Sequence, residues 1–371
     1  MKNALTGAAI FLAVTAAMLL VAEWSVRILY ADNTVLFPRY HTEAVYGDYT
    51  IRRIRPDSRF KHTSIDGSWE FVTNSQGFRN SDDFDYEKPA GVMRVLSLGD
   101  SHTQGYETRQ EHTFSAVTER YLNKSGVDAQ VINTGVSGFS TAEALVLLEN
   151  EGLKYQPDAV VLGFFANDLE DNLKASLFEI GTDGELVATR YTHIPGVRAQ
   201  NFIYSVPGIT WLSENSYFYS MLFNSVWEFF KSRLRQQSEE RVAEFAVPQK
   251  EEFSSYEIDL AAALLKRMHK VCADNDIPFI IVDIPLQVVD SKVMSSFPAE
   301  LRPMASRYSD AFIDSTELFE QYAGAAELHV PHGHRHISEF SHALIGAAVG
   351  RQILNLSKRV DASAPAQSSG R

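Results

Sequence analysis

A serine suited to nucleophilic chemistry stands directly after a short apolar run. Ser101 lies in Gly99-Asp100-Ser101, and the run from Val92 to Leu98 predicts a strand that ends at Gly99. A sharp turn from strand to helix would present the serine oxygen and direct nearby backbone N–H groups at a developing oxyanion. Glycines at 99 and 105 permit a close approach of the backbone there. The tripeptide alone is a weak signal, because most such tripeptides are simply turns.

Three later segments carry groups that suit the same chemistry. Gly138 follows a predicted strand over residues 129–133, and Asn167 follows a predicted strand over residues 159–165. A backbone N–H at glycine and a side-chain amide on asparagine are suitable donors to an oxyanion. Near the C-terminal end, His336 stands just ahead of a predicted helix, where its imidazole would serve as a general base for the serine.

Strand-like and helix-like segments alternate through most of the chain. The predicted strands cover residues 92–98, 129–133, 159–165, 278–284 and 311–314, and the predicted helices cover 113–122, 141–150, 258–274 and 338–356, the last with Ser338 as its N-cap. Alternation of this kind, with apolar strands, predicts an α/β protein with a flavodoxin-like three-layer α/β/α arrangement around a parallel sheet. Active sites in such folds gather at the carboxyl ends of the strands, where Ser101, Gly138 and Asn167 fall.

These blocks resemble those of the SGNH (GDSL-type) hydrolases. That family carries Ser in a Gly-Asp-Ser block, Gly in a second block, Asn in a Gly-x-Asn-Asp block and His in a final Asp-x-x-His block, matching here Ser101, Gly138, Asn167 and His336. The resemblance covers about residues 92–170 and 275–357 in the correct order. It implies the SGNH hydrolase fold, a Ser101 nucleophile that also supplies an oxyanion N–H, further oxyanion donors at Gly138 and Asn167, and His336 as base. The segment Asn74-Ser75-Gln76-Gly77-Phe78-Arg79 also looks like bacterial membrane-anchored members.

Two positions depart from the family pattern. Phe165 stands where glycine is usual in the third block, although Asn167 is kept. In the last block the acid is missing, because Gly333 occupies its place. Three readings follow: a Ser–His dyad oriented by a backbone carbonyl, an acid supplied from elsewhere in the fold, or His342 as base with Glu339 as its acid. We favour His336, because His342 falls inside the predicted helix.

Five of the eleven histidines cluster around this block: His329, His332, His334, His336 and His342. In an extended segment, residues 332, 334 and 336 would share one face and could hold zinc or copper. No Cys or Asp accompanies them at ligand spacing, so we expect one catalytic histidine among solvated loop neighbours, with no metal and no cofactor.

Three polar residues next to the motifs have structural interpretations. We expect His102 to pack against a neighbouring loop, with lining of the pocket as the alternative. Asp100 should hydrogen-bond the turn after the first strand, and Asp168 should satisfy backbone N–H groups beyond the third strand.

The N-terminal segment is the part of the chain whose composition differs most from that of a soluble protein. Nineteen residues from Ala4 to Ala22 carry no charge, which is about the length that crosses a bilayer as a helix. Trp24 and Tyr30 would suit the membrane interface. A cleaved signal peptide is the competing reading, but the run is long and lacks a clear cleavage site. We therefore expect a single-pass anchor over residues 1–30, with a catalytic domain that the family resemblance places in the periplasm or outside the cell.

The remaining chain divides into three parts. We expect a β-rich preamble over residues 31–90, the hydrolase domain over 91–357 with an aromatic-rich insertion at 171–250, and a disordered tail over 358–371. Within the insertion, residues 217–242 look helical, and the insertion could form a lid, a substrate wall, a membrane-facing surface or simply an extra packed helix.

Composition narrows the function further. The net charge of −13 argues against nucleic-acid binding, and the single cysteine, Cys272, rules out an internal disulfide. Three functions remain: a serine esterase acting on acyl esters of glycans, lipids or small molecules, an O-acyltransferase with a sugar hydroxyl in place of water, and a catalytically degenerate binding protein. The sequence leaves the acyl group, the alcohol and the oligomeric state undetermined.

Overall fold

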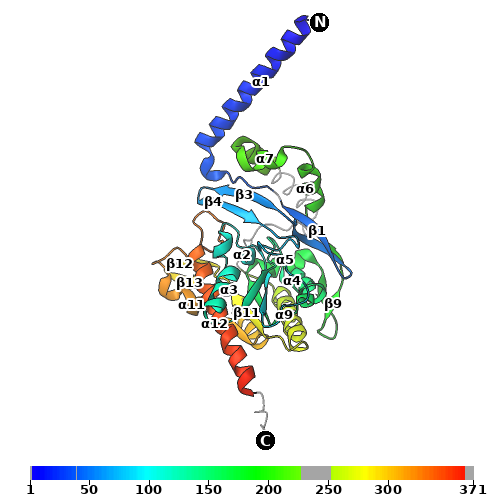
Figure 1. Ribbon diagram of the computed structural model, residues 1–371, viewed down its shortest axis with the longest axis vertical. Helices are drawn as coiled ribbons and strands as arrows, with labels where there is room; N and C mark the ends of the chain where they lie inside the picture. Colours follow the sequence, from blue (N-terminus) through cyan, green and yellow to red (C-terminus); the bar gives the residue numbers. More distant parts are fainter. Residues whose placement is uncertain (1, 39, 227–251, 364–371) are drawn as a thin grey trace.

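A parallel sheet of five strands organises the catalytic part of the molecule (Figure 1). The computed structural model describes residues 2–38, 40–226 and 252–363. The strands are β5 (Met93–Gly99), β6 (Ala129–Asn133), β7 (Ala159–Phe164), β11 (Phe279–Asp283) and β14 (Ala311–Ile313). Their order is β14-β11-β7-β5-β6, and every neighbouring pair is parallel. The flavodoxin-like prediction is confirmed, and the strand order reverses between β5 and β7, where ligands bind in such sheets.

Helices cover both faces of this sheet. One layer contains α4 (Thr141–Asn150), α5 (Asn167–Ala175) and α9 (Ser255–Ala273), and the other contains α3 (Phe114–Lys124) and α12 (Glu339–Ser363). Successive side chains of β5 enter different layers: Leu96 packs in the cluster that holds α4 and α9, and Val95 in the cluster that holds α3 and α12. Both faces are therefore apolar, as the near-continuous hydrophobic runs predict.

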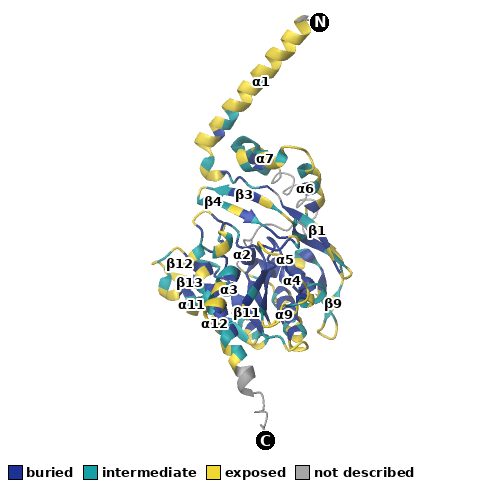
Figure 2. Ribbon diagram, viewed as in Figure 1, coloured by how far each residue is buried: buried dark blue, intermediate teal, exposed yellow. Residues whose placement is uncertain are grey.

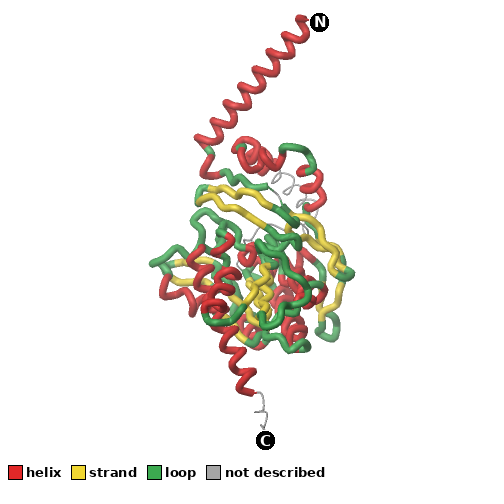
Figure 3. Tube along the Cα trace, viewed as in Figure 1, coloured by secondary structure: helices red, strands yellow, loops and turns green. Residues whose placement is uncertain are grey.

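The preamble forms two antiparallel hairpins over the carboxyl end of the sheet (Figures 1 and 3). Its strands are β1 (His41–Tyr46), β2 (Tyr49–Ile54), β3 (Arg59–Ser64) and β4 (Gly67–Val72). Phe60 and Phe71 stack at 4.8 Å between ring centroids, and each ring also contacts Tyr40. The buried aromatic faces join this region to the main core.

Part of the aromatic-rich segment adds to the preamble. A short strand, β10 (Thr192–His193), pairs in parallel with β2. The other short elements here are β8 (Phe178–Ile180), β9 (Leu186–Ala188), α6 (Val197–Tyr204) and α7 (Ile209–Asn215). Residues 217–226 are helical, and the rest of the helix expected over 217–242 lies outside the described residues.

Smaller elements complete the C-terminal half of the domain. They are β12 (Gln287–Val289) and β13 (Lys292–Met294), which form a hairpin, and the helices α10 (Arg302–Arg307) and α11 (Ser315–Phe319). The helix expected over 338–356 begins as predicted, because the Ser338 hydroxyl accepts from the Ser341 N–H at 3.3 Å. It continues to Ser363, however, so the expectation of a disordered tail from residue 358 is wrong for residues 358–363. No helix breaker interrupts that stretch before Pro365, and residues 364–371 lie outside the described part.

The N-terminal helix, α1 (Lys2–Leu29), projects away from the body (Figure 2). An 18-residue window within residues 3–29 has a mean hydropathy of 2.3, and this apolar stretch is exposed along its length. Within the described residues, this is the one helix long and apolar enough to cross a membrane or to act as a signal sequence. Its last turns are fastened to the body, because Glu23 accepts hydrogen bonds from the Ser216 hydroxyl and from the N–H groups of Tyr217 and Phe218.

Candidate active site

The turn after β5 presents Ser101 at the start of a short helix, α2 (Ser101–Gln104). Asp100 caps this helix, and its Oδ1 accepts from the His102 N–H at 2.8 Å, as expected for a turn-forming residue. Gly99 has a φ of 145°, and a Cβ there would lie 2.7 Å from the Gly163 carbonyl oxygen. Only glycine fits this approach of two strand ends.

Ser101 and His336 are hydrogen-bonded to each other. The His336 Nε2 lies 2.9 Å from the Ser101 Oγ, although the two residues are 235 positions apart in the chain. On its other side, His336 Nδ1 lies 2.5 Å from the Gly333 carbonyl oxygen. A carbonyl oxygen only accepts, so Nδ1 carries the proton and Nε2 has its lone pair directed at the serine hydroxyl. This is the tautomer that a general base requires.

The loop that carries His336 is a tight turn rather than an extended segment. His334 and Arg335 adopt left-handed backbone angles, with φ of 50° and 68°. The Val330 N–H donates to the His336 carbonyl and the Gly333 N–H to the Val330 carbonyl. The premise that residues 332, 334 and 336 share one extended face is therefore wrong, since His332 turns away to pair with Asp66 at 2.9 Å. The described residues hold no group of three metal-ligating side chains.

The two expected oxyanion donors follow β6 and β7, the two strands that flank β5. The loop carrying Gly138 is held against β5, because the Val136 N–H donates to the Gly99 carbonyl at 3.1 Å. Gly138 has a φ of 76°, and the Arg52 guanidinium would lie 2.9 Å from a Cβ at this position. Asn167 begins α5, and its Nδ2 donates to Asp171 at 2.9 Å. The Asn167 side chain also hydrogen-bonds with the Asp100 carboxylate, at the turn that carries Ser101.

The alternative base and acid occupy other places. The His342 Nδ1 accepts from the Phe114 N–H at 3.1 Å, at the start of α3, and its ring stacks on Phe114. Glu339 accepts from the Arg109 N–H and guanidinium. Neither contact involves Ser101, so the geometry favours His336 over His342. Asp168 accepts from the Phe165 N–H at 3.2 Å, in agreement with its expected structural role.

The hydrogen-bonded pair of Ser101 and His336 is buried in this structure. Ser101 is 0 % exposed and His336 is 2 % exposed. Burial lowers the pKa of His336 to about 4, so the imidazole is neutral and able to accept a proton at neutral pH. The His336 ring lies between two other rings, His102 at 4.9 Å and Tyr106 at 4.5 Å between centroids. His102 also packs on Phe165 at 4.1 Å, in the packing role expected for it.

Sequence reasoning missed several residues that surround this pair. Glu107 lies behind Gly333, and His62 from β3 lies 3.5 Å from the Glu107 carboxylate. Arg79 donates to the carbonyls of Gln104 and Thr108 at 2.8 and 2.6 Å and so fixes the loop after the nucleophile. Arg79 ends the Asn74–Arg79 motif, which was therefore a usable signal. Glu107 and His62 had no such signal.

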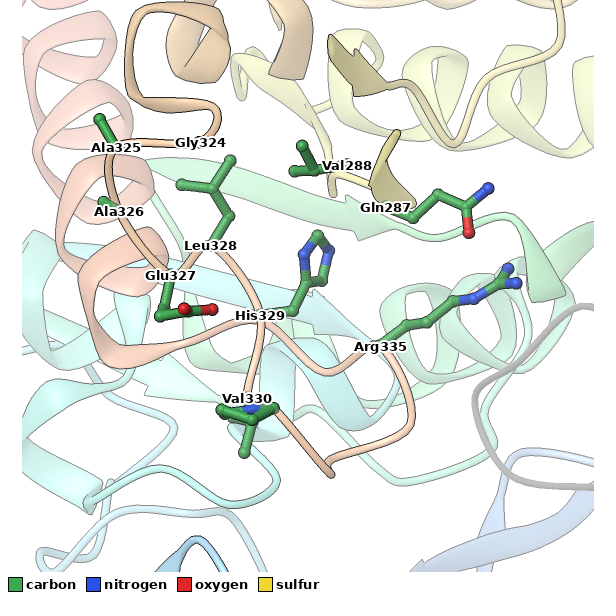
Figure 4. A pocket seen from close by; sticks show the side chains of 11 residues that line it. Gln287, Val288, Gly324, Ala325, Ala326, Glu327, Leu328, His329, Val330 and Arg335 are labelled. Carbon is green, nitrogen blue, oxygen red and sulfur yellow. The ribbon is translucent and has the colours of Figure 1, made fainter. Parts of the chain in front are cut away.

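A cavity of about 540 Å³ opens beside the His336 loop (Figure 4). Its polar lining includes Gln287, Glu327, His329 and Arg335, and its apolar lining includes Val288 and Leu328. The His329 ring is held by a contact between its Nε2 and the Pro285 carbonyl at 2.9 Å. Arg335 directly precedes His336, so the turn that positions the His336 imidazole also positions a cation in this cavity.

Comparison with known proteins identifies a family that this chain matches. The GDSL-like lipase/acylhydrolase family matches residues 97–344, well over half of the chain. An arylesterase from Vibrio mimicus is 27% identical over 125 residues, which cover 30% of this chain and 62% of the arylesterase, less than two thirds of its length.

Two bacterial enzymes are among the solved structures that are similar to this one. A lipase/acylhydrolase from Enterococcus faecalis has a TM-score of 0.40 at 18% identity, covering 71% of this chain and 96% of its own. The psychrotrophic esterase EstA from Pseudoalteromonas sp. has a TM-score of 0.40 at 13% identity, covering 71% of this chain and 98% of its own.

Proposed function

Because this chain belongs to the GDSL-like lipase/acylhydrolase family, we propose that it is a serine ester hydrolase that forms an acyl-serine intermediate on Ser101. One observation carries the proposal: the buried hydrogen bond of 2.9 Å between the Ser101 Oγ and the His336 Nε2. A neutral imidazole aimed at a serine hydroxyl, next to glycine and asparagine N–H groups, is the arrangement that acyl transfer requires.

The reaction proceeds in two balanced steps. His336 Nε2 takes the Ser101 hydroxyl proton while Oγ attacks the ester carbonyl carbon. The oxyanion accepts from the N–H groups of Ser101 and Gly138 and from the Asn167 amide. His336 then gives its proton to the leaving alcohol as the ester bond breaks. In the second step water replaces the alcohol, His336 takes its proton, and the acid leaves as Ser101 recovers its hydrogen. An O-acyltransferase would use a sugar hydroxyl in place of water.

The substrate is an acyl ester of a glycan, a lipid or a small molecule. The cavity beside the His336 loop would receive the alcohol portion, because Arg335 and Gln287 can donate hydrogen bonds to hydroxyl or carboxylate oxygens there. The arylesterase likeness suggests an aryl acetate as a first assay substrate. A sugar acceptor added to the same assay separates hydrolysis from acyl transfer.

We place the protein in a membrane through α1, with the catalytic domain in the periplasm or outside the cell. The exposed Trp211 of α7 supports contact of the body with the membrane surface, because Ser216, which directly follows α7, is hydrogen-bonded to Glu23 of α1. A Lys124→Cys variant tests the sidedness with an impermeant maleimide on intact cells. The native Cys272 is buried and supplies the unlabelled control. Labelling only after lysis would contradict the proposed orientation.

A fluorophosphonate probe tests the activated serine directly. The wild-type protein should be labelled, and Ser101→Ala should lose the label while keeping its fold. His336→Ala should react far more slowly, because the hydroxyl then lacks its base. A folded wild-type protein that takes up no label would refute the esterase and leave a binding protein with the same fold.

A further inference from the structure

The place of the missing acid is filled from another part of the chain. Gly333 has no side chain, and a Cβ added there would collide with the Glu107 Oε2. Val330 approaches from the other side, with its Cβ 2.7 Å from the added atom. A carboxylate therefore lies where the side chain of an acid at position 333 would begin, although it belongs to a residue only six positions after Ser101.

The backbone around Glu107 is built to hold this position. Glu107 has a φ of 55°, which a residue with a side chain adopts only when its surroundings enforce it. The enforcing group is Arg79, whose guanidinium donates to carbonyls on both sides of Glu107, including that of Thr108 at 2.6 Å. Arg79 is itself buried and lies over the Phe71 ring at 4.5 Å. The preamble thus clamps the loop that carries the carboxylate.

Glu107 carries a negative charge in this buried setting. Burial raises its pKa, but hydrogen bonding with His62 and Ser64 and the nearby His336 ring lower it by more, so that the net pKa is lowered. Oε1 faces His62, whereas Oε2 has no hydrogen-bond partner among the described residues. An ionised oxygen without a partner is costly at such depth unless a positive charge appears nearby during function.

We propose that Glu107 performs the electrostatic task of the absent acid, by stabilising the imidazolium that His336 becomes when it takes the proton of Ser101. The Gly333 carbonyl holds the Nδ1 proton, and Glu107 supplies the charge that a carbonyl lacks. Glu107 gains no proton: the proton moves from the Ser101 Oγ to the His336 Nε2 and on to the leaving alcohol. Glu107 is therefore a positioning residue that acts through His336, and its role rests on the esterase proposed above.

The surroundings of His336 define what a pH profile would report. The groups that face it are the Ser101 hydroxyl, the Gly333 carbonyl, the rings of His102 and Tyr106, and the side chains of His62, His334 and Glu107. Of these, Glu107 is the anion, and its charge raises the pKa of His336 against the larger effect of burial. Removing that charge should therefore lower the pKa of His336, whereas loosening and wetting the site should raise it.

The test compares Glu107→Gln, Glu107→Asp and Asp66→Asn in the full-length protein with p-nitrophenyl acetate. Glu107→Gln keeps the size and removes the charge, so kcat/KM should fall roughly 10- to 100-fold on the plateau. The acid limb of the profile should also move to lower pH. Glu107→Asp should recover part of both effects. Asp66→Asn loosens the contact between the β3–β4 turn and the His332 loop without removing the nearby anion, so it should not move the limb to lower pH.

The possible results distinguish a failure of the Glu107 inference from a failure of the proposed esterase function. An unchanged plateau in Glu107→Gln, or an acid limb that moves to higher pH, would show that Glu107 only supports the loop. Fluorophosphonate labelling of the same samples reports on Ser101: slow labelling of Glu107→Gln with normal labelling of the wild type supports the inference. If Glu107→Gln does not fold, NMR titration of the His336 ring in wild type and in Glu107→Asp decides. Because aspartate holds the carboxylate farther from His336, the pKa of His336 should be lower in Glu107→Asp than in wild type, and an unchanged or higher pKa would overturn the inference.

Discussion

Two regions meet at Ser101, and they hold their functional groups in different ways. The carboxyl edge of β5, β6 and β7 places Ser101, Gly138 and Asn167 within a few residues of the ends of three strands of one sheet. The loop from Leu328 to Ser338 places His336 by contacts between distant segments. The first region is determined by local motifs and sheet register. The second depends on the preamble, which supplies Asp66 and His62 and clamps the loop of Glu107.

The difference teaches where this site is rigid and where it depends on tertiary contacts. The end of a strand is fixed by the backbone hydrogen bonds that join the whole strand to its neighbours in the sheet. The His336 loop instead needs two left-handed residues and several long-range contacts, which lowers its local stability relative to the sheet. Changes at the strand ends should thus affect chemistry more than folding, whereas changes in the loop should couple chemistry to folding.

His336→Ala should produce the largest effect among changes in the loop. Removing the general base should lower kcat by about 10⁴-fold or more, because the serine hydroxyl is then a poor nucleophile. Steady-state kinetics with p-nitrophenyl acetate measures the loss. His342→Ala is the matched comparison, and an equally large loss there would transfer the role of base to His342.

Asn167→Ala tests the strand-end region. Loss of one oxyanion donor should lower kcat by roughly 10²- to 10³-fold with little change in KM, because the amide acts on charge that develops only in the transition state. The unfolding midpoint should also fall, because the buried Asp171 carboxylate loses the N–H that Asn167 donates to it. A change confined to KM would mean that Asn167 binds the substrate rather than the oxyanion.

His342→Ala should change stability rather than catalysis. The Phe114 N–H would lose its acceptor in a buried place, at a cost of roughly 1–3 kcal/mol. Urea unfolding measures this loss, while kcat/KM per folded molecule should stay within about threefold of wild type. Glu339→Gln should behave similarly in the kinetic assay, because its carboxylate pairs with Arg109.

Arg335→Gln should have the smallest effect. It keeps a donor in the cavity but removes the cation, so KM for an ester with an anionic alcohol portion should rise by roughly 2- to 10-fold at nearly constant kcat. A neutral ester of similar size provides the comparison. Equal changes for both esters would place the alcohol portion outside this cavity.

The same contrast explains what the sequence could predict. The strands, their parallel order and the positions of Ser101, Gly138 and Asn167 follow from apolar runs and from residues within a few positions of each strand end. The sequence also allowed the contact between the His336 imidazole and a backbone carbonyl, as one of three alternatives for the missing acid. Glu107 was out of reach, because nothing in the chain near residue 107 reveals that Gly333 leaves room for its carboxylate. The same holds for β10, a strand of two residues that exists through its pairing with β2.

The measurement that tests the central claim most directly is acid quenching of the reaction with p-nitrophenyl acetate, followed by peptide mapping. The account predicts an acetyl group on the peptide that contains Ser101, formed within the first turnover and lost as water completes the cycle. It also predicts no acetylated peptide in Ser101→Ala. Steady turnover with no acetyl group at Ser101 under any quench time, or turnover that survives in Ser101→Ala, would contradict the account.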